Sequence, residues 1–207
     1  MPISDSEWIR LREEQYKHIV EPFLPDQRRA HSGIPAISYG LSSAGYDLRL
    51  DGHSLAIVRG TGLAGAVKYI GTIDPKRVDK DQQFDIEYPI KDEETGELFW
   101  KLGPGDYALG LSLEYITIPR DHIGLCIGKS TYARCGLIVN TTPLEPEWHG
   151  HLVIELFNSM KSHYLKVYAW EGIAQLLLMP VQGEVKTSYA DRDGKYQGQD
   201  AITYAKV

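Results

Sequence analysis

The chain has 207 residues, a length at which one domain can bury a sizeable hydrophobic core. Its hydrophobic content of 43% and charged content of 24% are those of a globular protein, and its net charge of −6 argues against a general nucleic-acid binder, which needs a basic face. A small anionic ligand is still compatible with this charge, because it needs only a local cluster of donors.

The cysteines and the apolar runs indicate the compartment. Cys126 and Cys135 are too few for a disulfide framework and form no CxxC pair. The first residues lack the basic and apolar regions of a signal peptide, and no apolar run approaches the ~20 residues of a membrane span. We therefore expect a cytoplasmic protein that binds neither membrane nor nucleic acid.

The chain opens on an amphipathic pattern that predicts one helix over residues 4–23. Ser4 and Glu7 fit a capping box at its start, and Pro22 is expected to end it. Residues 1–22 are thus predicted to form an N-terminal helical arm.

Residues 24–45 are predicted to form an ordered, turn-rich connection, and short strands broken by Gly, Pro and Asp follow. The expected strands lie at residues 46–50, 54–58, 67–71, 85–89, 106–119, 122–128, 137–142, 151–159, 164–170 and 173–181. Many short strands with frequent turns indicate a barrel or a sandwich. The prediction is one mainly β domain over residues 1–207, with a polar, mobile tail at residues 186–207.

One of these strands, HLVIELFNS at residues 151–159, carries an unexpected acid. Strand alternation places Glu155 on an apolar face between Val153 and Phe157. A carboxylate in such a place is destabilising unless it is paired or its pKa rises. One explanation is an ion pair with an arginine in the core, and the other is a catalytic acid in a dry pocket.

About twenty residues earlier, GKSTYAR at residues 128–134 combines groups suited to a phosphate. Gly128 lets the backbone approach a ligand closely. The segment also supplies two cations and two hydroxyls, at Lys129, Arg134, Ser130 and Thr131. The alternative interpretation is a helical turn whose charges are solvated.

Other motifs for nucleotides and metals are missing from the sequence. No histidine has a glutamate two residues on, as the zinc deaminases require, and the cysteines are wrongly spaced for their second motif. Ile123 stands where a Walker P-loop needs its first glycine. His149 and His151 form an H-x-H, for which a turn leading into the strand is a simpler explanation than a metal site.

Taken together, several segments resemble the dCTP deaminases of the trimeric dUTPase superfamily. They are SSAGYDLRL, GKSTYAR, PLEPEWHG, VIELFNS, EGIAQLLL and SYADRDGKYQGQ, in chain order. The resemblance covers nearly the whole chain, although LIVNTTPLEPEW is shorter than the hairpin of many members and Lys129 stands where arginine is frequent. It implies a homotrimer of distorted jelly-roll β-barrels with an N-terminal helix and with nucleotide sites between subunits. It also implies hydrolysis of dCTP to dUTP and ammonia, without zinc, on a Mg²⁺–triphosphate complex.

The resemblance also implies roles for residues at matching positions. Glu155 is expected to be the general base and proton shuttle, Ser130 and Arg134 to orient the water and the base, and Lys129 to hold phosphate. Further substrate contacts are expected from Thr131, Thr142, Trp148, Tyr189, Lys195, Tyr196 and Gln199, with the tail closing on the triphosphate. Asp47 is a candidate to hold Mg²⁺ through water, and a plain turn acid is its alternative role.

This chemistry suits a lone buried acid. Attack at C4 of cytosine needs a water that loses a proton while the ring nitrogen gains one. A single carboxylate whose pKa is raised by desolvation can do both. Because no metal acidifies the water, positioning contributes more.

Rival functions differ in the residues they need. Glu145 lies where dUTPases place the acid that activates water, so a dUTPase, or a bifunctional enzyme that releases dUMP and pyrophosphate, is the alternative. The missing Gly-rich fifth motif speaks against a pure dUTPase. A non-catalytic nucleotide sensor would have lost Glu155, Ser130 or Arg134, and all three are present. The resemblance also makes dTTP a candidate inhibitor.

Overall fold

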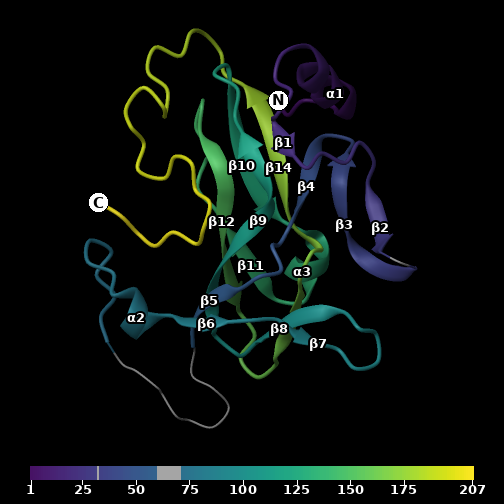
Figure 1. The fold of residues 1–207 in the computed structure, drawn as a ribbon, viewed down its shortest axis with the longest axis vertical. Coiled ribbons are helices and arrows are strands. Elements are labelled where there is room, and N and C mark those ends of the chain that lie inside the picture. Colours follow the sequence, from purple (N-terminus) through teal and green to yellow (C-terminus); the bar gives the residue numbers. More distant parts are fainter. Residues whose placement is uncertain (32, 60–70) are drawn as a thin grey trace.

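The computed structural model describes residues 1–31, 33–59 and 71–207, and its strands form three antiparallel sheets (Figure 1). The first sheet has the order β11 (Leu137–Asn140), β12 (His149–Asn158), β9 (Tyr107–Thr117), β5 (Leu55–Val58) and β6 (Asp85–Glu87), and β1 (Val20–Glu21) also pairs with β9. The second has the order β10 (His122–Gly128), β14 (Gly172–Pro180), β4 (Gly45–Arg49), β3 (Ile34–Ser42) and β2 (Arg28–His31). The third has the order β13 (Leu165–Tyr168), β8 (Leu98–Leu102) and β7 (Ile90–Lys91). The helices are α1 (Asp5–Glu14), α2 (Lys80–Gln83) and α3 (Ser130–Arg134).

The prediction of a mainly β fold with an N-terminal helix is confirmed. Within the described ranges, the strands form separate sheets rather than one closed barrel. Nine of the ten expected strands coincide with observed ones. The tenth, at residues 67–71, lies almost entirely outside the described residues.

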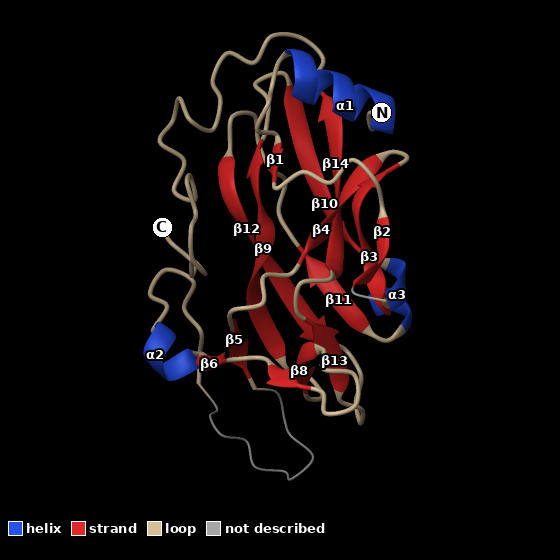
Figure 2. Cartoon of the chain, turned by 45° about the vertical axis from the view of Figure 1, so that its right-hand side comes forward, coloured by secondary structure: helices blue, strands red, loops and turns tan. Residues whose placement is uncertain are grey.

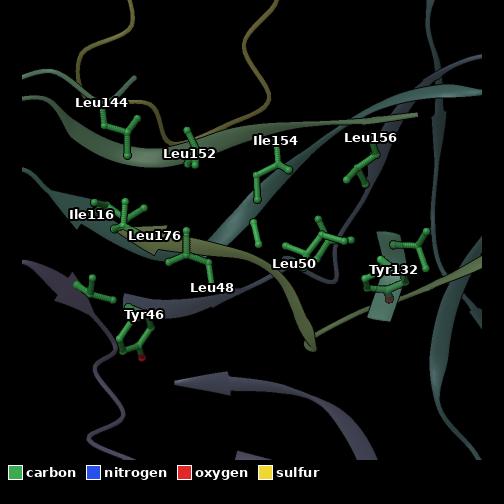
Figure 3. Packing of buried hydrophobic residues seen from close by; sticks show 14 of the residues in the cluster. Tyr46, Leu48, Leu50, Ile116, Tyr132, Leu144, Leu152, Ile154, Leu156 and Leu176 are labelled. Carbon is green, nitrogen blue, oxygen red and sulfur yellow. The ribbon is translucent and has the colours of Figure 1, made fainter. Parts of the chain in front are cut away.

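The main core lies between the first and second sheets (Figure 3). Leu48 of β4 and Leu176 of β14 face Ile116 of β9 and Ile154 of β12, and all four are fully buried. Each such side chain contributes roughly 1.5–3 kcal/mol by leaving water. The alternation predicted for β12 is confirmed, because Leu152, Ile154 and Leu156 all belong to this core.

The N-terminal helix begins as predicted and ends earlier. The Ser4 hydroxyl accepts the Glu7 N–H at 3.4 Å, and the buried Trp8 lies on the inward face. The prediction that the helix continues to Pro22 is wrong, because α1 ends at Glu14 and Val20–Glu21 forms β1. The β-branched residues Ile19 and Val20 are buried by pairing with β9, and this tertiary contact outweighs the local helical pattern.

The ordered, turn-rich connection predicted over residues 24–45 contains two regular strands that the prediction did not include. Most of this segment forms the hairpin of β2 and β3, with Gly33 at a φ of +84° near its turn. Strand β8 was also not predicted; its Trp100 is buried and donates its indole N–H to the Glu87 carbonyl at 3.0 Å. These strands are stabilised by hydrogen bonds between the paired backbones, and the alternation of side chains in the sequence did not indicate this pairing.

The C-terminal tail, residues 186–207, runs beside β12 without forming a strand of its own (Figure 2). An isolated bridge pairs its Gln199 with Gly150 in parallel. Gly150 has a φ of +144°, and a Cβ built on it would lie 2.7 Å from the Gln199 nitrogen. The mobility expected of this tail stays a prediction. Across the described part of the chain, no helix is long and apolar enough to cross a membrane.

Candidate active site

A cavity of about 850 Å³ lies between the first sheet and the C-terminal tail. Its floor is the sheet face turned away from the main core, where Tyr107, Leu109, Val153 and Glu155 lie. The loop before β12 and the tail form its walls, with Thr142, Pro143, Leu144, Glu145, Trp148, Tyr189, Arg192, Lys195, Tyr196 and Gln199. This volume is within the range of sites for nucleotide-sized ligands.

Glu155 is the only ionisable residue of β12 on this floor, and its carboxylate is poorly solvated. Its backbone pairs with Leu109 of β9 and Asn140 of β11. The Oε2 atom is buried and has no hydrogen-bond partner among the described residues. Burial raises the pKa of Glu155 to about 7, so the carboxyl changes its protonation near neutral pH.

The alternative explanation for this acid, an ion pair with a core arginine, is wrong for Glu155. The residues that the structure describes include no such partner for it. That arrangement occurs instead at Glu114 of β9, whose buried carboxylate accepts the Arg49 Nε–H at 2.7 Å. The contrast shows that this fold can pair a buried acid with a cation, and that the described part of the chain provides none for Glu155.

The loop and tail residues predicted from the resemblance meet at this cavity. Trp148 is buried and donates its indole N–H to the Tyr196 carbonyl at 2.9 Å. The Tyr196 N–H donates to the Tyr189 hydroxyl at 3.0 Å, and the His151 N–H donates to the Gln199 carbonyl at 2.8 Å. With Thr142 and Lys195, which also line the cavity, these contacts bring six predicted substrate-binding residues around Glu155.

The α3 residues, by contrast, do not line the cavity. This short helix lies on the opposite side of the chain from the tail in both views (Figures 1 and 2). Ser130, Thr131 and Arg134 are exposed there, and the Arg134 guanidinium donates to the Ser130 carbonyl at 3.2 Å. One chain therefore carries the two halves of the predicted catalytic set at two separate places.

Lys129 and Asp47 lie together at the start of α3. Their Nζ and Oδ2 atoms are 2.5 Å apart, and the side chains are 10% and 2% exposed. Gln27 also donates its amide N–H to Asp47 Oδ2 at 2.9 Å. This pair joins α3 to β4 and places Asp47 beside the phosphate motif rather than on the cavity floor. Its expected water-mediated contact with Mg²⁺ stays a prediction.

The two histidines of the H-x-H motif hold backbone and tail contacts. The His149 Nδ1 atom lies 3.0 Å from the amide nitrogen of Gln197, and the His151 Nδ1 atom lies 3.0 Å from the Ser112 carbonyl. Over the described residues, no group of three or more His, Cys, Asp or Glu side chains is arranged to hold a metal ion.

Sequence reasoning did not identify Tyr107 and Arg192, which line the cavity, or Gln197, which bonds beside it. Tyr107 lies on the cavity floor, where burial and the nearby Glu155 raise the pKa of its phenol to about 12. Strand alternation in β9 could have indicated it, because residues 107 and 109 share a face. Arg192 forms an ion pair with Glu145 and lies 5.3 Å from the Tyr189 ring centre, and Gln197 bonds the Glu147 carbonyl at 2.7 Å. No local pattern indicated these tail contacts.

A solved structure shares this architecture. The crystal structure of 2'-deoxycytidine 5'-triphosphate deaminase from Agrobacterium tumefaciens matches with a TM-score of 0.50 and 17% identity, over 86% of this chain and 47% of that chain. The present chain thus spans about half the length of that one. The likeness shows that the two chains share a fold.

The sequence comparisons are more specific. Curated relatives from Dichelobacter nodosus and Pseudomonas aeruginosa, each described as dCTP deaminase, are 41% identical over 207 residues, with 100% of both chains covered. A family described as dCTP deaminase-like matches residues 3–181. The chain belongs to the dCTP deaminase-like family.

Proposed function

We propose that this protein hydrolyses dCTP to dUTP and ammonia, with Glu155 as the general base. The observation that carries the proposal is a partly buried carboxyl group on the floor of a nucleotide-sized cavity, with a pKa of about 7 and with an Oε2 atom that has no hydrogen-bond partner among the described residues. The relatives described as dCTP deaminase support the choice of substrate.

In the proposed reaction, Glu155 moves protons between water and the pyrimidine. The water oxygen bonds to C4 as its proton passes to the carboxylate, which delivers that proton to N3. A second proton moves from the new hydroxyl to the amino nitrogen, the C4–N bond breaks, and ammonia leaves. A pKa near the working pH lets one group both accept and donate at modest free-energy cost.

We propose that a neighbouring copy supplies α3 to this cavity within a homotrimer. Ser130 and Arg134 would then lie beside Glu155, orienting the water and the base. Exposed apolar side chains near α3 support a subunit contact there: Ile127, Ile138 and Phe157 are 48%, 52% and 37% exposed. Lys129 can keep its pair with Asp47 and still reach a phosphate, because an ammonium group has three donors.

Mg²⁺ is proposed to arrive with the triphosphate. The described residues offer only Asp47 near the phosphate motif, which fits an ion held mainly by phosphate oxygens and water. Bound there, Mg²⁺ would neutralise phosphate charge. We also propose that dTTP, as another pyrimidine triphosphate, competes for the same cavity.

The test is a product analysis. The protein is incubated with dCTP and Mg²⁺, and dCTP, dUTP and dUMP are separated by chromatography while ammonia and pyrophosphate are assayed. We expect equal amounts of dUTP and ammonia. Pyrophosphate and dUMP formed from dCTP would show the bifunctional reaction, and turnover of dUTP alone would overturn the proposal. The ion pair between Glu145 and Arg192 favours dUTP and ammonia as the products, because it engages the carboxylate that a dUTPase needs to activate water.

A further inference from the structure

Arg120, in the turn between β9 and β10, joins two distant parts of the chain through its guanidinium group. Nη1 donates to Glu147 Oε2 at 2.6 Å, and Nη2 donates to Asp191 Oδ2 at 2.8 Å. Glu147 precedes the cavity residue Trp148, and Asp191 belongs to the tail. Charge-assisted bonds from the two arms of one rigid fork fix the distance between these segments.

The same guanidinium also holds the backbone where the tail begins. Nη2 donates to the carbonyls of Val185 at 3.2 Å and Lys186 at 3.4 Å. Ser188 is 1% exposed, and its N–H donates to Asp191 Oδ2 at 2.9 Å. Arg120 also lowers the pKa of Asp191 to about 2, so this carboxylate stays ionised at neutral pH. Residues 185–191, which we call the tail root, therefore form a closed turn around Arg120.

The tail root continues directly into the cavity wall. The Tyr189 N–H donates to the Pro146 carbonyl at 2.9 Å, and Glu147 has a φ of +64°. The tail root and the Pro146–Trp148 turn are thus packed against each other, with Arg120 bonded to both. Tyr189, which lines the cavity, connects this junction to Tyr196, because its hydroxyl accepts the Tyr196 N–H.

We propose that Arg120 is a positioning residue for nucleotide binding, which clamps the tail root to the Pro146–Trp148 turn so that the tail residues face the cavity before nucleotide arrives. This inference rests on the proposed function for its kinetic test. Arg120 is not among the cavity-lining residues and acts through Tyr189 and Tyr196. Ordering the tail in advance removes an entropic cost from binding, so its loss weakens affinity more than chemistry.

The kinetic test compares Arg120→Ala with Arg10→Ala. Arg10 is a matched control, because its side chain is also 42% exposed and also pairs with two carboxylates, Glu7 and Glu14, far along the sequence from the tail. We expect Arg120→Ala to raise the KM for dCTP about 10-fold, with kcat changed less than about threefold, since saturating nucleotide closes the tail again. Arg120→Lys keeps the charge but loses the two-armed guanidinium group, so its KM should lie between those of Arg120→Ala and Arg10→Ala.

A second readout does not depend on activity. Limited trypsin digestion can cut the tail after Lys186, Arg192 and Lys195. We expect Arg120→Ala to be cut there at least about fivefold faster than wild type and Arg10→Ala, at an unchanged melting temperature. Asp191→Ala should increase the rate of tail cleavage similarly. The double variant Arg120→Ala/Asp191→Ala should be cut no faster than either single variant.

The outcomes separate this inference from the proposed function. If the wild type does not deaminate dCTP but Arg120→Ala exposes the tail to trypsin, the proposed function fails and the clamp remains. Tail cleavage and KM equal to those of wild type would overturn the clamp. A lowered melting temperature with kcat and KM affected equally would also overturn it, because Arg120 would then only stabilise the fold.

Discussion

Replacing Glu155 by glutamine tests the buried carboxylate directly, because the amide has nearly the same shape and no charge. Burial raises the pKa of Glu155 to about 7 from its ordinary value of 4.5. The folded protein therefore binds this proton more tightly than the unfolded chain does. The stabilisation that this bound proton gives the folded state is complete below pH ~4.5 and is lost as the pH rises through about 7.

The magnitude follows from the difference between these two values. At 1.36 kcal/mol per pKa unit, full burial would destabilise the wild type at pH 8 by at most about 3.4 kcal/mol. The side chain is only partly buried, so solvent screening reduces the expected effect to about 1–2 kcal/mol. For a chain of this size, Glu155→Gln should then raise the melting temperature by about 2–8 °C at pH 8.

The assay is thermal unfolding of both proteins at several pH values, combined with turnover of dCTP. We expect the stability gap to grow between pH 5 and pH 8, the oligomer and dCTP binding to persist, and turnover to fall at least ~10²-fold. Glu13→Gln, at an exposed position of α1, is the control for a lost charge. A stability gap independent of pH would refute the burial argument, and wild-type turnover would refute the role of Glu155 as the base.

Three further predictions concern the pH profile, the shared site and the core. The value of kcat/KM should rise about tenfold per pH unit below pH ~7 and then level off, because Glu155 must be ionised to accept a proton; a flat profile from pH 5 to 8 would contradict this. Mixing inactive Glu155→Gln and Arg134→Ala subunits should restore about a quarter of the activity, because hybrid trimers contain intact shared sites; no restoration would indicate a site within one chain. Arg49→Ala should destabilise the fold by about 3–5 kcal/mol in chemical denaturation by leaving Glu114 buried without its cation, whereas Lys161→Ala, at an exposed position, should not.

Local patterns in the sequence predicted the parts of the fold that depend on local chemistry. The alternation around Glu155 correctly placed Ile154 in the core and the acid on the opposite face. Helical spacing also correctly located the start of α1. It failed beyond Glu14, because the pairing of Val20 with Ile116 of β9 joins residues far apart in the sequence.

The candidate site shows the same division. The tail motif around Tyr196 was predicted to close on the triphosphate, which stays a prediction, and the structure shows that Tyr196 and Glu155 line one cavity. The separation of Arg134 from that cavity within one chain is a property of the three-dimensional fold, and motif order carries no information about it. The role of Arg120 could not be predicted from the sequence, because its partners lie 27 and 71 residues away and form no local motif.

The position of the C-terminal tail beside β12 depends on Gly150, because glycine has no side chain. At Gly150 even a methyl group would lie 2.7 Å from the nitrogen and 3.1 Å from the oxygen of the Gln199 backbone. A larger residue there would push the last nine residues off the strand while leaving the acid five positions further on untouched. Enclosure of the ligand and the acid–base step can thus be altered independently along a single strand.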